Sequence, residues 1–132
     1  MSTPSAAQGL PGRPFAAPGS DAVDDAARLD DSGWATASRR ALAGIDETLA
    51  ARFDRADDVD ALVAARAHAV DGLVRSAWAR CFGDGCAMSL FAVGGYGRGE
   101  LFPQSDVDLL VLAEPDAQAA HADALSRFVA LL

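Results

Sequence analysis

Two aspartates separated by one residue carry the clearest chemical signal in this sequence. Asp106 and Asp108 enter an apolar run that favours a β-strand, where residues i and i+2 share a face. Two carboxylates placed side by side repel each other unless a cation lies between them. Oxygen ligands suit Mg²⁺, which keeps several waters and takes further ligands from substrate phosphates. We therefore expect Asp106 and Asp108 to bind Mg²⁺, with a solvated strand end as the alternative.

The Asp-x-Asp spacing is uninformative without this setting. Aspartate occupies 16 of the 132 positions, so about two such pairs are expected by chance, and the chain contains two. The other pair, Asp58 and Asp60, lies where a helix is expected to begin. Acidic side chains are favourable there because they complement the helix dipole.

A glycine-rich segment precedes the aspartate pair. Residues 94–105 have the sequence GGYGRGELFPQS and follow an apolar run directly. Glycines permit positive φ and close backbone approach, so amide N–H groups can face an anion. Gly94, Gly95 and the guanidinium of Arg98 are therefore candidate phosphate contacts. Ser105 could donate its hydroxyl to a phosphate or cap a turn, and a plain flexible connection is the alternative for the whole segment.

Together, the two segments predict a site for a metal–nucleotide complex. The glycine amides and Arg98 would hold the β- and γ-phosphates, and the aspartates would hold Mg²⁺ at the α-phosphate. The metal and the backbone dipoles would supply the positive field in a chain of net charge −8 that contains no lysine.

Composition excludes several other classes of function. A P-loop requires its lysine, and the glycine spacing is not the GxGxxG of a dinucleotide-binding fold. A nucleic-acid footprint of clustered basic residues is missing, and no run approaches the roughly 18 apolar residues of a membrane span. We therefore expect no nucleic-acid or membrane partner, and nothing in the sequence indicates an oligomeric state.

Hydrophobic periodicity predicts an α+β fold. A helix is expected over residues 34–53, and a second from Asp57 or Asp58 to a turn at 82–85. Strands are expected over 88–93 and 107–112, both buried on two faces as in a covered sheet. On the second helix, we expect three arginines mainly off the apolar face: Arg66, Arg75 and Arg80. A last helix is expected to begin near Asp116 and to present four apolar residues on one side: Leu125, Phe128, Val129 and Leu132.

The first 33 residues are expected to form a disordered leader rich in Pro, Gly and Ala, because few large apolar groups are present to offset chain entropy. No basic n-region precedes an apolar core, so no signal peptide is predicted. Cys81 and Cys86 are too few for a disulfide framework. The expected compartment is therefore the cytoplasm.

At this point the sequence resembles a known group. Gly94-Gly95 followed by Asp106-x-Asp108 is similar to the signature of the polymerase-β-type nucleotidyltransferase superfamily. The full string from 94 to 110 resembles the bifunctional uridylyltransferase/uridylyl-removing enzymes that modify the PII nitrogen-signalling protein. The helix that contains Arg66 and Asp71 is also similar to the one preceding that family's catalytic domain.

The resemblance implies a reaction and a role for each matching residue. A tyrosine hydroxyl of PII would attack the α-phosphate of UTP, which releases pyrophosphate. Asp106 and Asp108 would be the metal-binding catalytic carboxylates, and Gly94 and Gly95 the nucleotide-phosphate contacts. Arg98 and Ser105 would be supporting contacts in nucleotide binding.

The sequence departs from this family in extent. Family members are several times longer, and no part of this chain corresponds to their HD-type or ACT domains. The superfamily also uses a third carboxylate on a later strand, and Glu114, Asp116 and Asp123 are not placed for that role. We therefore expect a helical segment over 34–83 and, over 84–132, a partial nucleotidyltransferase core that is truncated at its C-terminus. The alternatives are an adenylyltransferase-type enzyme that modifies a protein, or an inactive nucleotide-binding fragment.

Overall fold

A computed structural model describes residues 28–132 of the chain, and most of the expected leader lies outside these residues. The fold is a mixture of α-helices and a small β-sheet, as predicted. The elements in chain order are α2 (Asp31–Asp54), α3 (Val59–Cys81), β1 (Met88–Ala92), α4 (Gly94–Gly97), β2 (Leu109–Ala113), α5 (Pro115–Ala120) and α6 (Ala122–Leu131).

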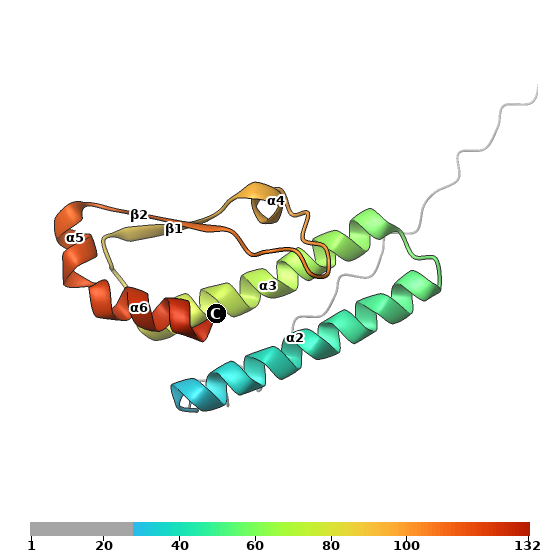
Figure 1. Cartoon of the computed structure of the whole chain (residues 1–132), viewed down its shortest axis with the longest axis horizontal. Coiled ribbons are helices and arrows are strands. Elements are labelled where there is room, and N and C mark those ends of the chain that lie inside the picture. Colours follow the sequence, from blue (N-terminus) through green and yellow to red (C-terminus); the bar gives the residue numbers. More distant parts are fainter. Residues whose placement is uncertain (1–27) are drawn as a thin grey trace, which may run out of the picture.

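The two long helices lie antiparallel to each other along the length of the described chain (Figure 1). Both begin at an aspartate cap, since the carboxylates of Asp30 and Asp58 accept hydrogen bonds from the amides of Gly33 and Ala61, at 2.7 and 3.0 Å. The second cap confirms the predicted start of α3. The first places the start of α2 at Asp31, three residues before the expected position.

The sheet consists of two antiparallel strands, with Phe91 opposite Leu110 and Met88 opposite Ala113. It lies over α3, with α5 and α6 at one end (Figure 1). The prediction that both faces are buried is wrong. Among residues 28–132, helices cover only one face, and Phe91, Leu110 and Leu112 on the other face are about half exposed (46, 45 and 54%). A run of consecutive apolar residues cannot reveal which face lacks a cover.

The strand bounds also differ from the expectation at a point that matters for the site. β2 begins at Leu109, so Asp106 and Asp108 lie before the ladder in an irregular segment. They had been expected on one face at the entry of a strand over 107–112. Val107 is 40% exposed and does not take part in the strand pairing.

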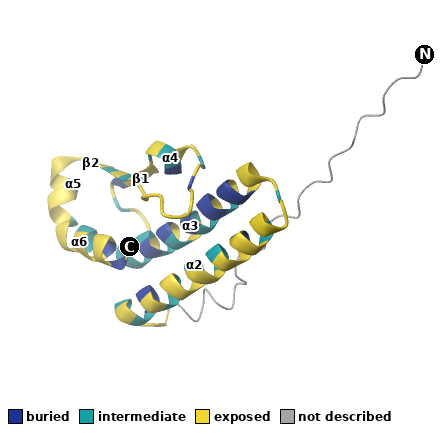
Figure 2. Ribbon diagram, turned by 45° about the vertical axis from the view of Figure 1, so that its right-hand side comes forward, coloured by how far each residue is buried: buried dark blue, intermediate teal, exposed yellow. Residues whose placement is uncertain are grey.

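The core lies between the covered face of the sheet, α3 and α6. Trp78 stacks at a tilt on Phe82, with ring centroids 4.2 Å apart, and meets the ring of Phe128 edge-on at 5.2 Å. The buried residues follow the inner face of α3 (Figure 2). This aromatic contact fixes α6 against the end of α3.

The last helical region is divided where one continuous helix had been expected. α5 ends at Ala120, the φ of −110° at His121 interrupts the helix, and α6 then begins at Ala122. The buried stripe of α6 contains Phe128 and Leu131, whereas Val129 is 70% exposed and Leu132 is 55% exposed. The predicted apolar side is therefore wrong for Val129 and Leu132, because the packed stripe advances by three residues to Leu131.

An ion-pair cluster joins three helices. Asp31 at the start of α2 accepts from Nε of Arg80 on α3 (2.8 Å) and from Nε of Arg127 on α6 (2.6 Å). Arg127 also donates to the backbone carbonyl of Arg80. The hydrogen bonds from Arg127 and Arg80 hold the pKa of the Asp31 carboxyl well below its usual range.

Candidate active site

The glycine segment forms a single helical turn, α4, where a loop had been expected. Val93 precedes the turn, and its carbonyl accepts from the amide of Gly97 at 2.9 Å. The turn then closes back on itself, because the carbonyl of Gly95 accepts from the amide of Glu100 at 2.9 Å. Gly94 and Gly99 have φ of 62° and 74°, which an L side chain rarely adopts.

Gly94 and Asp108 lie directly against each other. The amide of Val93 donates to the carbonyl of Asp108 at 3.0 Å, which extends the strand pairing by one step. A Cβ atom built on Gly94 would lie 2.9 Å from Oδ2 of Asp108. Because Gly94 has no side chain, this carboxylate oxygen can lie close to its backbone. The structure thus brings together one predicted phosphate contact and one predicted metal ligand.

Tyr96 anchors the glycine turn to α3. Its ring is 4% exposed, and its hydroxyl donates to Oδ1 of Asp71 at 2.6 Å. Burial and this hydrogen bond raise the pKa of the Tyr96 phenol well above its usual range. Tyr96 had no predicted role from the sequence. One feature of the sequence could have indicated this role. Tyr96 is the single aromatic residue among the glycines of 94–99, so its ring is the side chain best able to anchor the turn by packing inward.

Ser105 and Asp106 follow a tight turn of the backbone. The amide of Ser105 donates to the carbonyl of Phe102 at 3.0 Å, and the turn is preceded by Leu101, which is fully buried. The side chains of residues 102–108 are all exposed. Leu101 thus fixes one end of an otherwise exposed segment that carries the candidate site residues.

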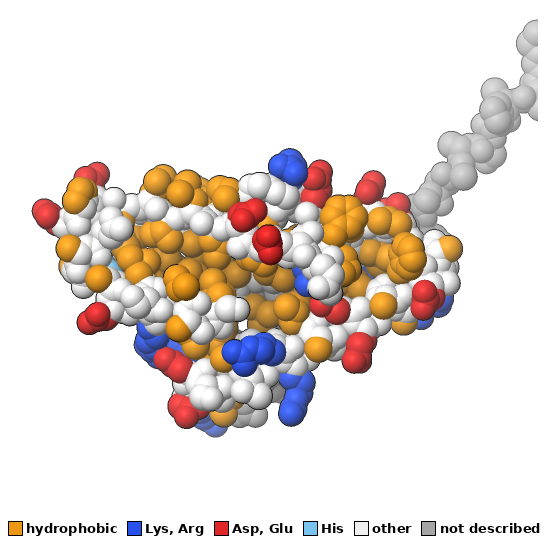
Figure 3. All heavy atoms as spheres, viewed as in Figure 1, with side chains coloured by type: hydrophobic (Ala, Val, Ile, Leu, Met, Phe, Trp, Pro, Cys, Tyr) orange, Lys and Arg blue, Asp and Glu red, His pale blue; other side chains and the backbone are white. Residues whose placement is uncertain are grey.

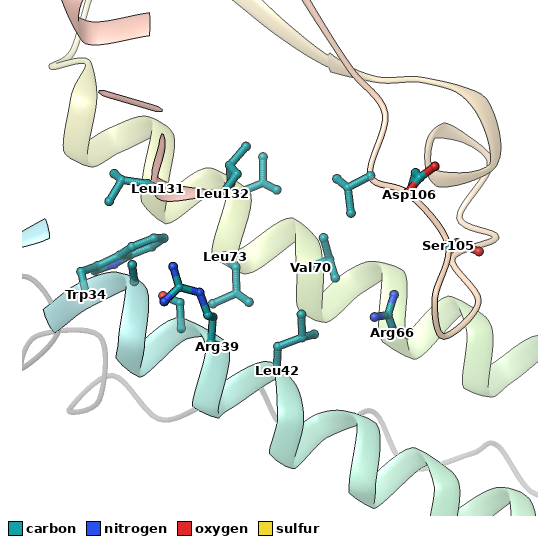
Figure 4. Close-up of a pocket in the computed structure, with 14 residues that line it drawn as sticks. Trp34, Arg39, Leu42, Arg66, Val70, Leu73, Ser105, Asp106, Leu131 and Leu132 are labelled. Atoms are coloured by element: carbon teal, nitrogen blue, oxygen red, sulfur yellow. The ribbon is translucent and has the colours of Figure 1, made fainter. Parts of the chain in front are cut away.

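Asp106 borders a cavity of about 380 Å³. The close-up shows Trp34, Arg39 and Leu42 of α2 facing Val70 and Leu73 of α3 across this space, with Ser105 and Asp106 on the loop at one end (Figure 4). The space-filling view shows a hollow with an apolar floor and acidic side chains above it (Figure 3). The cavity gives Asp106 an open approach on its α2 side.

Arg66 is buried, although it was expected mainly off the apolar face of α3. It is 8% exposed, and its guanidinium contacts Asp46 on α2 and the backbone carbonyl of Phe102. The signal was present in the sequence: Arg66 is spaced by four from both Leu62 and Val70, so these three residues share one helix face. The predicted apolar face of α3 included Leu62 and Val70 but omitted Arg66, which lies between them.

Arg98 lies at the end of the glycine turn and pairs with Glu100. The distance between Nε of Arg98 and Oε2 of Glu100 is 3.0 Å, and the two side chains are 65% and 56% exposed. Such an exposed pair contributes little stability and exchanges readily with other partners. The guanidinium therefore remains available for an anionic ligand at the turn.

The candidate donors for a metal are the carboxylates of Asp106 and Asp108. The described residues 28–132 contain no group of three or more Asp, Glu, His or Cys side chains placed to hold an ion. Asp106 and Asp108 are both exposed, and their oxygens are the hard ligands that Mg²⁺ prefers. The residues fit a cation that completes its coordination with water and with phosphate oxygens.

Comparison with known proteins gives these features a context. Residues 79–131 match the family model described as a nucleotidyltransferase domain, a range that contains both strands, the glycine turn and the aspartate pair. None of the helices in the described part of the chain has the length and apolarity to span a bilayer. No solved structure matches the chain.

Several curated proteins are similar in sequence, all of them named bifunctional uridylyltransferase/uridylyl-removing enzyme. The protein of Xanthomonas campestris pv. campestris (strain B100) is 55% identical over 102 residues, which are 77% of this chain and 12% of the relative. That of Xanthomonas axonopodis pv. citri is 53% identical over the same shares. That of Pseudomonas putida (strain F1) is 42% identical over 97 residues, which are 73% of this chain and 11% of the relative.

The chain thus spans about 12% of the length of the Xanthomonas relatives. The similarity covers 77% of the residues of this chain. The chain is similar over most of its length to one segment of the bifunctional uridylyltransferase/uridylyl-removing enzymes, and its residues 79–131 match a nucleotidyltransferase domain.

Proposed function

We propose that this chain supplies part of the active site of a Mg²⁺-dependent enzyme that transfers UMP from UTP to a tyrosine of the PII signalling protein. The observation that carries the proposal is the contact between Gly94 and Asp108. A phosphate held by the amides of the glycine turn would lie beside a carboxylate able to share its metal ion. The names of the relatives supply the nucleotide and the class of reaction.

Each candidate residue has a distinct task in this proposal. The amides of Gly94 and Gly95 bind phosphate oxygens, and the guanidinium of Arg98 leaves Glu100 to bind a further one. Ser105 donates its hydroxyl to a phosphate oxygen. Asp106 and Asp108 hold the metal, with Asp106 also facing the cavity through which a partner could approach.

The chemistry requires charge to be stabilised at the α-phosphate. When bound, Mg²⁺ would neutralise the negative charge that develops on the phosphoryl group during transfer. The residues of this chain orient the nucleotide so that the α-phosphate faces the attacking tyrosine hydroxyl of PII. Pyrophosphate then leaves toward the glycine turn, where the amides and Arg98 bind it.

The proposal includes the organisation and location of the protein. We assign residues 34–83 to a helical segment that supports the site, and residues 84–132 to a nucleotidyltransferase core. Cys81 and Cys86 are both free thiols, in keeping with a reducing compartment such as the cytoplasm.

A chimera tests the transfer reaction. The segment of the Xanthomonas campestris relative that matches this chain would be replaced by this chain, since the two are 55% identical. The chimera should transfer label from α-labelled UTP to PII, and Asp106→Asn and Asp108→Asn should each reduce the rate by orders of magnitude while the protein remains folded. Equal labelling by ATP would instead favour an adenylyltransferase, and full activity of both variants would remove the carboxylates from the site.

A further inference from the structure

Arg66 is the one charged side chain that is buried in the part of the chain between residues 28 and 132. It lies in the middle of α3 and faces α2 and the loop above it (Figure 4). A buried guanidinium is tolerated only where its charge is balanced and its N–H donors are matched. The partners of Arg66 therefore indicate what this residue is for.

The first partner balances the charge. Asp46 on α2 accepts from Nε of Arg66 at 2.8 Å and from Nη2 at 3.4 Å, in the fork arrangement typical of an Arg–carboxylate pair. This pair joins the middle of α2 to α3. It leaves the remaining nitrogen, Nη1, free to bind another element.

The second partner belongs to the candidate active site. Nη1 of Arg66 donates to the backbone carbonyl of Phe102 at 3.3 Å. That same carbonyl accepts from the amide of Ser105 at 3.0 Å and so closes the turn that leads to Asp106. Arg66 thus contacts the one backbone atom on which this turn closes.

Contacts from outside the turn at 102–105 help to keep it in this conformation. Pro103 and Gln104 occupy its two central positions, and Gln104 has a φ of 70°, which favours glycine over any residue with a side chain. Pro103 suits the first central position of such a turn, whereas Gln104 is unfavourable at the second, so contacts from outside contribute to the observed shape. Leu101, fully buried, holds the backbone before the turn, and Arg66 holds the turn itself.

We propose that Arg66 is a positioning residue for the metal site, acting through the Phe102 carbonyl to hold Ser105 and Asp106 in place. The inference rests on the proposed role of Asp106 in binding Mg²⁺. Residues of this kind orient a metal ligand without touching the metal. Removing one commonly lowers metal affinity by about 10- to 100-fold.

Arg80 provides a matched control for the test. It also lies on α3, pairs with an aspartate of α2 (Asp31, at 2.8 Å) and donates to a backbone carbonyl, that of Leu29. Arg80→Met therefore removes the same kind of interhelical contact as Arg66→Met, at the opposite end of the helix pair. It makes no contact with the turn at 102–105.

Two readouts are measured on the 132-residue chain. Amide hydrogen exchange at Ser105, in the metal-free protein, reports the turn, and Mn²⁺ titration followed by electron paramagnetic resonance reports the metal site. Arg66→Met should accelerate exchange at Ser105 and weaken Mn²⁺ binding by about tenfold or more. Arg80→Met should leave both values near those of the unmodified chain.

A rescue variant separates positioning from a general loss of stability. Gln104→Gly favours the left-handed conformation without help, so the double variant Arg66→Met/Gln104→Gly should recover most of the Mn²⁺ affinity. Arg66→Lys, which keeps the charge but not the fork, serves as the milder variant if Arg66→Met does not fold, with the same expected directions.

The outcomes are distinguishable. If the unmodified chain binds Mn²⁺ and Arg66→Met binds it equally well, or if Arg80→Met weakens binding as much, Arg66 is not a positioning residue. If the folded, unmodified chain binds no Mn²⁺, the proposed metal site itself is wrong. The exchange rate at Ser105 then still decides whether Arg66 holds the turn.

Discussion

The hydroxyl of Tyr96 donates a 2.6 Å hydrogen bond to Oδ1 of Asp71. This contact fixes the glycine turn to the middle of α3, just as the contact from Arg66 to Phe102 fixes the turn before Asp106. Both halves of the candidate site are therefore held by the same helix. The sheet links the two halves directly, through the hydrogen bond from the amide of Val93 to the carbonyl of Asp108.

Tyr96→Phe should destabilise the fold by about 2 kcal/mol, because it removes a hydrogen bond to a charged group and leaves the Asp71 carboxylate without that donor. Urea unfolding of the variant and the unmodified chain measures the difference. An unchanged midpoint would show that the glycine turn is held by packing of the ring alone.

The titration of Tyr96 provides a pH prediction. It is the only tyrosine in the chain, so phenolate absorbance reports this residue alone. Because its folded-state pKa is raised, its contribution to stability is complete below the ordinary tyrosine pKa of about 10 and is lost as the pH rises from there through the folded value. Titration at the ordinary value in the folded protein would contradict the buried hydrogen bond.

Gly94→Ala should disturb both the backbone and Asp108. The positive φ of Gly94 alone should cost about 1–2 kcal/mol with any side chain, and the new methyl group would lie 2.9 Å from Oδ2 of Asp108. Gly99→Ala is the control, since Gly99 has a similar φ of 74° but open space around it.

Both variants should therefore lose similar stability in urea, whereas only Gly94→Ala should weaken Mn²⁺ binding. Equal binding by the two variants would mean that the contact between Gly94 and Asp108 has no role in metal binding.

Phe128→Ala tests the packing of α6. The ring is 2% exposed and meets Trp78 edge-on, so its removal should destabilise the fold by about 3–5 kcal/mol. Val129→Ala is the control: its side chain is 70% exposed, and the change should remain within about 0.5 kcal/mol. Thermal unfolding of both variants measures the difference, and comparable losses would restore the apolar face first expected for this helix.

The ion-pair cluster at Asp31 predicts acid sensitivity. Its carboxyl has a depressed pKa in the folded chain because Arg127 and Arg80 donate to it. The stabilisation is therefore present above the unfolded-state pKa of about 4 and is lost as the pH falls from there through the folded value. Asp31→Asn should lower the unfolding midpoint at neutral pH, with a difference that shrinks below about pH 4; a difference independent of pH would exclude the ion pairs as its cause.

The sequence predicted the order of elements and the two long helices because their signals are local. The apolar spacing and the cap at Asp58 act within a few residues of one another. The exposed sheet face at Phe91 and Leu110 could not be predicted, because it depends on which elements of the chain pack against it. The break at His121 was missed because no proline or glycine marks it.

The candidate site could be predicted in its residues more than in its geometry. The glycine segment and the aspartate pair were found from residue types and spacing, and the structure brings Gly94 against Asp108. The supports from Tyr96 and Arg66 were missed because each depends on a partner 25 or 36 residues away in the chain. Such contacts leave no periodic pattern in the sequence.

The central claim is that the glycine turn and the carboxylate pair together bind a metal–nucleotide complex. Calorimetric titration of the folded chain with UTP, in the presence of Mg²⁺ and again with a chelator, tests it most directly. We predict binding in Mg²⁺ that disappears with the chelator and in the double variant Asp106→Asn/Asp108→Asn. Binding that persists without metal or in the variant, or no binding by a folded chain, would contradict the claim.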